Sequence, residues 1–127
     1  MDIDAKRALI TRYLDAYNRF DVSAMMATVH DEVVFQNISD GAVTAQADGA
    51  EALRQMAEQA TAMFTTRRQS MKDFAVDGEQ AVIRVDFEGV LACDLPNGMR
   101  AGQRIAVQGR SEFTFRDDRL VRIVDIS

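Results

Sequence analysis

The feature that most constrains the fold is a strict alternation of apolar and polar side chains near the C-terminus. Between positions 105 and 115, every second residue is apolar or small, while Gln108, Arg110 and Glu112 occupy positions between them. A period of two is typical of β-strands, whose successive side chains point to opposite faces. The alternating apolar or small residues of this strand are Ile105, Val107, Gly109, Ser111, Phe113 and Phe115.

A second stretch, 80–93, alternates in the same way through Ile83, Val85, Phe87 and Leu91. Together with turn signals at Asp77-Gly78, around Pro96 and at Asp117-Asp118, the pattern predicts four strands over 67–76, 80–93, 100–116 and 119–126. One face of these strands is apolar and must be covered. An earlier strand is predicted over 33–38, followed by a polar loop over 39–47.

Helices in the first half of the chain can cover that face. Leu9, Tyr13, Tyr17 and Phe20 repeat at helical spacing and predict a helix over 5–19. A short helix follows from Asp21 or Ser23 to Val29, and either residue could cap it. A third helix is expected to begin at a capping box, 48–51 (DGAE). We therefore expect an α+β fold in which a curved antiparallel sheet packs on three N-terminal helices, as one domain spanning residues 1–127.

Composition limits the possible functions. The net charge of -5 argues against a nucleic-acid surface, and Arg67-Arg68 is interpreted as a solvated strand start. No segment approaches the length of a membrane span, and the acidic N-terminus does not resemble a signal peptide, so no membrane contact and a cytoplasmic location are expected. The single cysteine, Cys93, is interpreted as a small buried hydrophobe. No ligand spacing for a metal and no phosphate loop is present, so no metal and no cofactor are expected.

Four passages give the chain a family resemblance that covers almost its whole length. It is similar to the nuclear transport factor 2-like superfamily, and most of all to its SnoaL-like branch, which includes polyketide cyclases. The resemblance implies a cone-shaped half-barrel that encloses a ligand pocket, and it implies a homodimer. The passages are 12–17 (RYLDAY), 26–35 (MATVHDEVVF), 48–53 (DGAEAL) and 109–120 (GRSEFTFRDDRL).

Ketosteroid isomerase shares this fold and supplies a residue-by-residue comparison. It uses a carboxylate base, a tyrosine and a protonated aspartic acid, and it is a worked example of pKa tuning. The resemblance places the tyrosine at Tyr13, the base at Asn37 and the second donor near Ser111. An amide cannot accept and return a proton at neutral pH, so a steroid isomerase of that type is not expected.

Without a catalytic base, the comparison still predicts an apolar pocket with a few polar groups. Such a pocket suits a small apolar molecule with one or two oxygens. Each polar group also has a structural interpretation: Tyr13 as a core aromatic, Asn37 as a strand-end residue and Ser111 as a small packing residue. His30 is interpreted as a helix-end residue. The predicted ligand contacts are Tyr13, Tyr17, Phe35, Asn37, Met56, Phe87, Ser111 and Phe113.

Three functions stay open on the sequence alone. The first is an isomerase, cyclase, hydrolase or dehydratase that acts on an apolar oxygenated substrate of polyketide or steroid type. Its base would be a carboxylate not placed inward by the alternation, with Asp73, Asp86 and Asp125 as candidates. The second is a non-catalytic binding protein for the same class of molecule. The third is a dimerisation module that uses the charged outer face of the sheet. An inward carboxylate beside the pocket would favour the enzyme.

Overall fold

A computed structural model describes all residues, 1–127, and contains three helices and six strands. The elements follow the order expected for an α+β protein, with most of the helical residues in the first half of the chain. The helices are α1 (Ile3–Asn18), α2 (Val22–Met26) and α3 (Ala50–Thr61). The strands are β1 (Val29–Ser39), β2 (Ala42–Asp48), β3 (Phe64–Asp77), β4 (Gln80–Leu91), β5 (Arg104–Arg116) and β6 (Arg119–Ile126).

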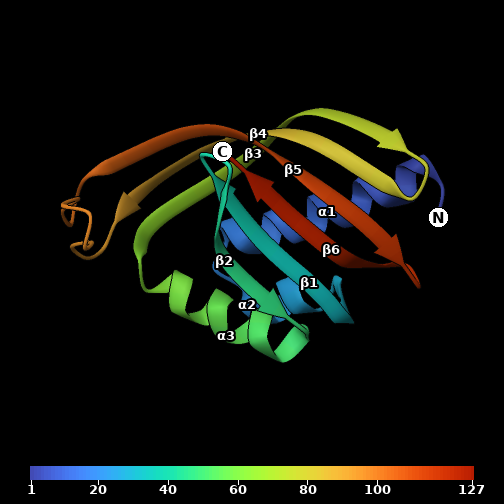
Figure 1. Ribbon diagram of the computed structural model, residues 1–127, viewed down its shortest axis with the longest axis horizontal. Helices are drawn as coiled ribbons and strands as arrows, with labels where there is room; N and C mark the ends of the chain where they lie inside the picture. Colours follow the sequence, from blue (N-terminus) through green and yellow to red (C-terminus); the bar gives the residue numbers. More distant parts are fainter.

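The strands form one curved sheet in the order β2-β1-β6-β5-β4-β3. All neighbours are antiparallel except β1 and β6, which run parallel. Figure 1 shows the long strands β3, β4 and β5 arching over α1, while α3 lies beside β1 and β2. The predicted fold class is therefore confirmed. None of the helices is long and apolar enough to cross a membrane.

Several local predictions were wrong. The short helix α2 ends at Met26 rather than Val29, β1 begins at Val29 rather than at position 33, and β5 begins at Arg104 rather than at position 100. Residues 42–48, expected mostly as part of a loop, form the edge strand β2 and pair with β1. The N-cap of α3 is Gly49 rather than Asp48, and no side chain caps the helix. Gly49 has a φ of +92°, which only glycine adopts without strain, so the backbone turn begins the helix in place of a capping box. At α2, by contrast, Asp21 does accept a hydrogen bond from Ala24 N.

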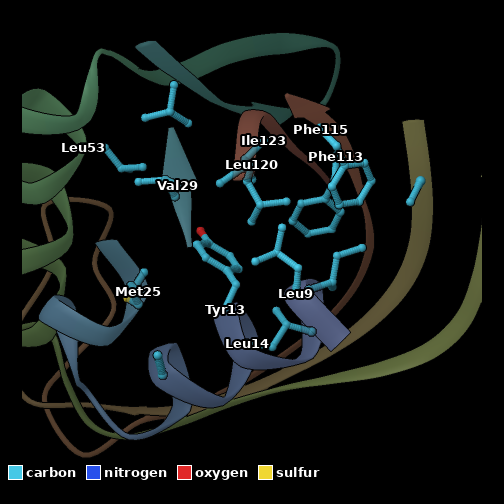
Figure 2. Close-up of a cluster of buried hydrophobic side chains, with 14 of the residues drawn as sticks. Leu9, Tyr13, Leu14, Met25, Val29, Leu53, Phe113, Phe115, Leu120 and Ile123 are labelled. Carbon is cyan, nitrogen blue, oxygen red and sulfur yellow. The ribbon is translucent and has the colours of Figure 1, made fainter. Parts of the chain in front are cut away.

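The core lies between α1 and the apolar face of the sheet (Figure 2). Tyr13 stands near its centre, with its ring edge-on to Phe113 at 6.1 Å between centroids. Complete burial of side chains of this size stabilises a fold by about 1.5–3 kcal/mol each. The labelled members of the cluster are Leu9, Tyr13, Leu14, Met25, Val29, Leu53, Phe113, Phe115, Leu120 and Ile123.

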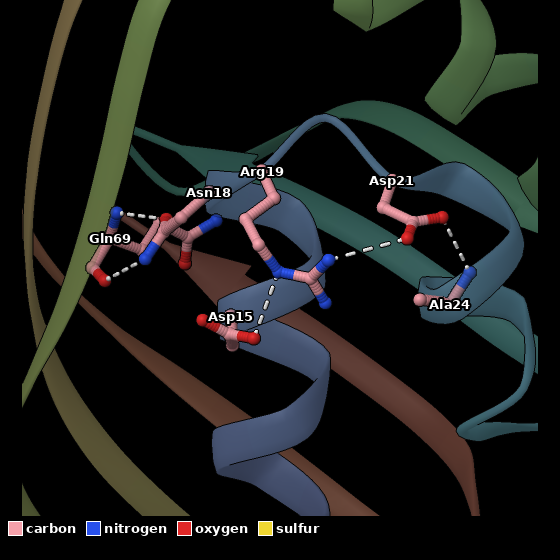
Figure 3. A network of polar contacts seen from close by, with 6 residues as sticks. All are labelled: Asp15, Asn18, Arg19, Asp21, Ala24 and Gln69. Carbon is pink, nitrogen blue, oxygen red and sulfur yellow. Dashed lines mark hydrogen bonds and ion pairs between the residues drawn. The ribbon is translucent and has the colours of Figure 1, made fainter.

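The C-terminal end of α1 is fastened to the edge strand β3 (Figure 3). The Asn18 side chain accepts a hydrogen bond from Gln69 N at 2.7 Å and donates one to Gln69 O at 3.1 Å, as a neighbouring strand would. Ion pairs lie next to this contact, because Arg19 pairs with both Asp15 and Asp21. These contacts fix the last turn of α1, and with it Tyr17, against the sheet.

Three further residues lie elsewhere than the sequence suggested. Arg67 is buried, only 5% exposed, rather than solvated at a strand start. Cys93 is exposed after the end of β4, because the strand stops at Leu91 and the apolar run no longer faces the core. His30 belongs to β1 rather than to a helix end, and its Nε2 lies 3.2 Å from Oδ2 of Asp117.

Candidate functional site

A half-open cleft of about 250 Å³ lies between the C-terminal part of α1 and the inner face of the sheet. Tyr17 contributes from α1, Asn37 from β1 and Gln69 from β3, and the rest of the lining comes from β4, β5, β6 and the C-terminal residue. About half of the lining is apolar. The remaining lining residues are Val85, Phe87, Ile105, Val107, Gly109, Arg110, Ser111, Asp125, Ile126 and Ser127.

The register of the sheet places three polar residues in one row across this cleft. Asn37 of β1 is opposite Asp125 of β6, and Asp125 is opposite Ser111 of β5. Directly opposed residues point to the same face of a sheet, with Cβ atoms about 4.5–5.5 Å apart. The row therefore brings an amide, a carboxyl group and a hydroxyl together on one patch of the cleft wall.

Asp125 points into the cleft because of a β-bulge. Counting on from the turn at Asp117-Asp118, an unbroken ladder would pair Asp125 with Arg110 and turn it to the outer face. Between Thr114 and Phe115 the register shifts by one residue, so that Asp125 pairs with Ser111 instead. A one-residue slip moves every following side chain to the opposite face. The bulge thus converts a surface carboxylate into a residue of the candidate site.

The environment of Asp125 alters its acid–base behaviour. Ser111 Oγ donates a hydrogen bond to Asp125 Oδ1 at 2.6 Å. Burial raises the pKa of Asp125 from 3.8 to about 6, and the hydrogen bond from Ser111 opposes that shift. Burial disfavours the charged carboxylate, whereas a donated hydrogen bond favours it. Asp125 can therefore both accept and return a proton near neutral pH.

Close by, the two tyrosines of α1 are held in their neutral forms. Burial raises the pKa of the Tyr13 hydroxyl, and the negative charge of Asp125 raises it further. Burial also raises the pKa of Tyr17, where the positive charge of Arg67 acts in the opposite direction. Tyr17 lines the cleft, while Tyr13 is 5% exposed and belongs to the core. A neutral phenol at Tyr17 can donate a hydrogen bond to an oxygen in the cleft.

The structure separates the predicted ligand contacts into two groups. Tyr17, Asn37, Phe87 and Ser111 line the cleft. Four others lie outside its lining: Tyr13 and Phe113 are buried in the core, and Phe35 and Met56 are partly buried against it. As ligand-binding residues all eight stay predictions, but only the first group could touch a molecule in this cleft without rearrangement.

Asn37 has partners among the side chains of its own hairpin. Its Nδ2 donates to Thr44 Oγ1 at 2.8 Å and to Ser39 Oγ at 3.2 Å. These bonds hold the amide at the rim of the cleft. They involve the nitrogen atom only, so Oδ1 can accept a hydrogen bond from a hydroxyl group in the cleft.

The other two candidate bases lie on the outer face. Asp73 pairs with Arg84 at 3.3 Å, and Asp86 pairs with Lys72 at 3.7 Å, in both cases with exposed side chains. Asp125 is thus the carboxylate of that set that faces the cleft. Its sequence context gave no local signal, since the bulge that reorients it depends on how β6 pairs with β1 and β5. The arrangement of a poised carboxyl group, a neutral phenol and apolar walls can move a proton on a bound organic molecule.

Comparison with known proteins places this geometry in context. A family model described as a SnoaL-like domain matches residues 10–123. No curated protein matches the sequence. Many solved structures share the fold, among them TsrD from Streptomyces laurentii, with a TM-score of 0.82, 22% identity and coverage of 98% of this chain and 89% of TsrD.

Two other structures of the same fold have descriptions that bear on ligands. A candidate polyketide cyclase from Xanthomonas campestris pv. campestris has a TM-score of 0.77 and 22% identity, covering 98% of this chain and 90% of that one. TerC, co-crystallised with polyporic acid, has a TM-score of 0.77 and 15% identity, covering 96% of this chain and 90% of TerC. At these identities the likeness concerns the fold.

Proposed function

This chain belongs to the SnoaL-like domain family, and on that premise we propose that it is an enzyme that moves a proton on a small, mostly apolar carbonyl compound. Asp125 is the general base and acid of the proposed reaction. The observation that carries the proposal is the inward carboxyl group at the cleft, with a pKa of about 6. A base is most effective when its pKa lies near the working pH.

The lining of the cleft supports this class of substrate. Val85, Phe87, Ile105 and Val107 present apolar surface, while Asn37, Asp125 and Ser111 form one polar row across the sheet. Sites of this kind bind molecules with an apolar body and orient them by a few hydrogen bonds. The descriptions of two fold relatives, a candidate polyketide cyclase and a protein co-crystallised with polyporic acid, are consistent with an oxygenated organic substrate.

In the proposed reaction, the Asp125 carboxylate removes a proton from the carbon next to the substrate carbonyl. The electron pair of the C–H bond moves to the carbonyl oxygen, giving an enolate. Tyr17 and Gln69, on the opposite side of the cleft from β6, donate hydrogen bonds to that oxygen. Asp125 then returns the proton to a carbon of the enolate, so that no cofactor is needed to balance the step. Ser111 holds the carboxyl group by its 2.6 Å hydrogen bond.

The proposal is tested by proton exchange on a surrogate ketone. In deuterated buffer, the proton on Asp125 exchanges with the solvent through the half-open cleft, and Asp125 then delivers deuterium to the enolate carbon. The protein should therefore accelerate replacement of the α-protons of 2-tetralone, which is followed by proton NMR. The rate of exchange in the presence of the protein, after subtraction of the rate in buffer alone, should rise as pH increases and level off above about pH 6. The reason is that the ionised form of Asp125 is the base. Ser111→Ala removes the bond that stabilises the carboxylate and should move the midpoint to higher pH. A rate no greater than that of buffer at every pH would contradict the proposal.

We also propose that the protein is a homodimer. Its outer sheet face carries charges of both signs in cross-strand pairs, such as Arg104 with Glu88 at 3.0 Å and Arg84 with Asp73 at 3.3 Å. Such a face can meet a second copy of itself by exchanging ion pairs. Light scattering at micromolar concentration should give twice the 14.2 kDa mass of the chain. A stable monomer under those conditions would refute the dimer.

A further inference from the structure

A buried arginine beside the cleft has hydrogen-bond donors without partners. Arg67 is 5% exposed, and its Nη1 and Nη2 atoms have no acceptor within the protein. Buried polar groups in folded proteins are nearly always paired, and buried charges are paired in particular. The two unpaired nitrogens of this buried guanidinium therefore need an explanation. The simplest explanation is that a bound molecule supplies the acceptor.

The known contacts of Arg67 account for the position of its side chain but not for those two nitrogens. Nε donates to the carbonyl of Tyr17 at 2.9 Å, where the negative end of the α1 dipole lies. The guanidinium carbon lies 3.7 Å from the centre of the Tyr17 ring and 4.4 Å from that of Phe20. Aromatic faces attract a cation but accept no in-plane hydrogen bond from Nη1 and Nη2. The outer nitrogens of the guanidinium, Nη1 and Nη2, therefore have no acceptor within hydrogen-bond distance.

Arg67 does not line the cleft itself, but it lies beside two residues that do, Tyr17 and Gln69. On β3 it lies two residues from Gln69, and residues at this spacing share a face about 6–7 Å apart. Gln69 lines the cleft, as does Tyr17, whose ring stacks on the guanidinium. Arg68, between them in sequence, points to the other face and is exposed. The positive charge is therefore next to the cleft, on the side away from Asp125.

We propose that Arg67 binds a carboxylate group of the substrate. The planar fork of Nη1 and Nη2 matches the two oxygens of a carboxylate, which would accept both hydrogen bonds at once. The two nitrogens are closed to solvent in this structure, so a carboxylate reaches them only after the side chains around them shift. The inference rests on the proposed function, and it narrows the substrate to an apolar carbonyl compound that also carries an acid group.

The test uses two probes of nearly the same shape, the anion 2-naphthoate and the neutral 2-naphthamide. Binding is measured by calorimetry at pH 5, below the pKa of about 6 of Asp125, so that repulsion from that carboxylate is small. The protein should bind naphthoate about tenfold or more tightly than naphthamide, as expected for one charge-assisted pair of hydrogen bonds. Arg67→Met should remove that preference, so that the variant binds the two probes with similar affinity. Arg68→Met, an equal loss of charge on the exposed outer face, should keep the preference.

Because Arg67 also contacts the end of α1, the Met variant could fail to fold. A second measurement on the unaltered protein then tests whether Arg67 contacts the carboxylate. Naphthoate, but not naphthamide, should shift the NMR signals of the Arg67 guanidinium nitrogens. Equal affinity for the two probes, or unshifted Arg67 signals, would overturn the inference. Failure of the proposed function is seen separately, as absence of ketone exchange, so naphthoate preference without exchange would leave Arg67 as an anion site and remove Asp125 as a base.

Discussion

Replacement of Asp125 by Asn should lower the enzyme-catalysed exchange of 2-tetralone protons by about 10³-fold, to near the rate in buffer. General acid–base catalysis by a positioned side chain contributes about 10²–10⁴-fold. Asn has almost the same shape and can still accept the hydrogen bond from Ser111 Oγ, which now spans 2.6 Å to Asp125. The substitution therefore removes the proton acceptor while keeping the geometry of the cleft. Proton NMR in deuterated buffer at pH 7 measures the effect.

Asp73→Asn is the matched control, because it makes the same chemical change on the outer face. Asp73 pairs with Arg84 and its side chain is 66% exposed. Its loss should leave the exchange rate within about twofold, since an exposed ion pair contributes little. If Asp125→Asn and Asp73→Asn had equal rates, the cleft carboxylate would have no catalytic role, and the binding-protein alternative would be favoured.

The strands of the second half could be predicted because their patterns are local. In β5, Phe113 and Phe115 alternate with polar residues, and nothing in the tertiary structure changes that order. The bounds of β6, 119–126, were correct for the same reason. Strand β2 was missed because residues 42–47 are mostly small and β2 lies at the sheet edge, where few neighbours require bulky side chains.

The site was harder to predict because it depends on contacts between distant parts of the chain. Asp125 faces the cleft only because Val121 is an extra residue in the ladder between β5 and β6. That irregularity coincides with the parallel pairing of β6 with β1, where Leu120 N donates to Thr28 O at 2.9 Å. No property of residues 119–126 alone requires either event. A sequence pattern indicates the alternation of a strand, but not the register that decides which set faces inward.

Arg67 illustrates the same point for a charged residue. Two adjacent arginines at a strand start are typical of a solvated segment, yet alternation necessarily turns one of them inward. The end of α1, some 50 residues earlier, stabilises the inward-facing side chain of Arg67. It supplies a backbone carbonyl and two aromatic rings. Those partners become visible only once the helix is docked on β3. The unpaired part of the guanidinium could not be inferred from sequence at all.

The same Asp125→Asn variant that loses activity should be more stable than the unaltered protein at neutral and alkaline pH. The pKa of Asp125 rises from 3.8 to about 6 on folding, so the folded state favours the protonated form. The stabilisation that comes from protonated Asp125 is therefore complete below about pH 3.8, falls as pH rises toward 6, and is absent above that. At about 1.4 kcal/mol per pKa unit, the charged carboxylate costs the fold about 3 kcal/mol at pH 8.

The amide group that this variant carries in place of the carboxyl group is neutral at every pH and avoids that cost. Urea unfolding should therefore give the variant a free energy of unfolding about 3 kcal/mol higher at pH 8, and nearly the same value as the unaltered protein at pH 4. Asp73→Asn should show no such gain at either pH, because its carboxylate is exposed and ion-paired. The Asp125 carboxylate would then destabilise the fold at the same pH at which it acts as a base. A catalytic role explains why such a residue is kept, whereas a structural role does not. Equal stability of the two proteins at pH 8 would mean that Asp125 ionises freely, and the proposed base would lose its tuned pKa.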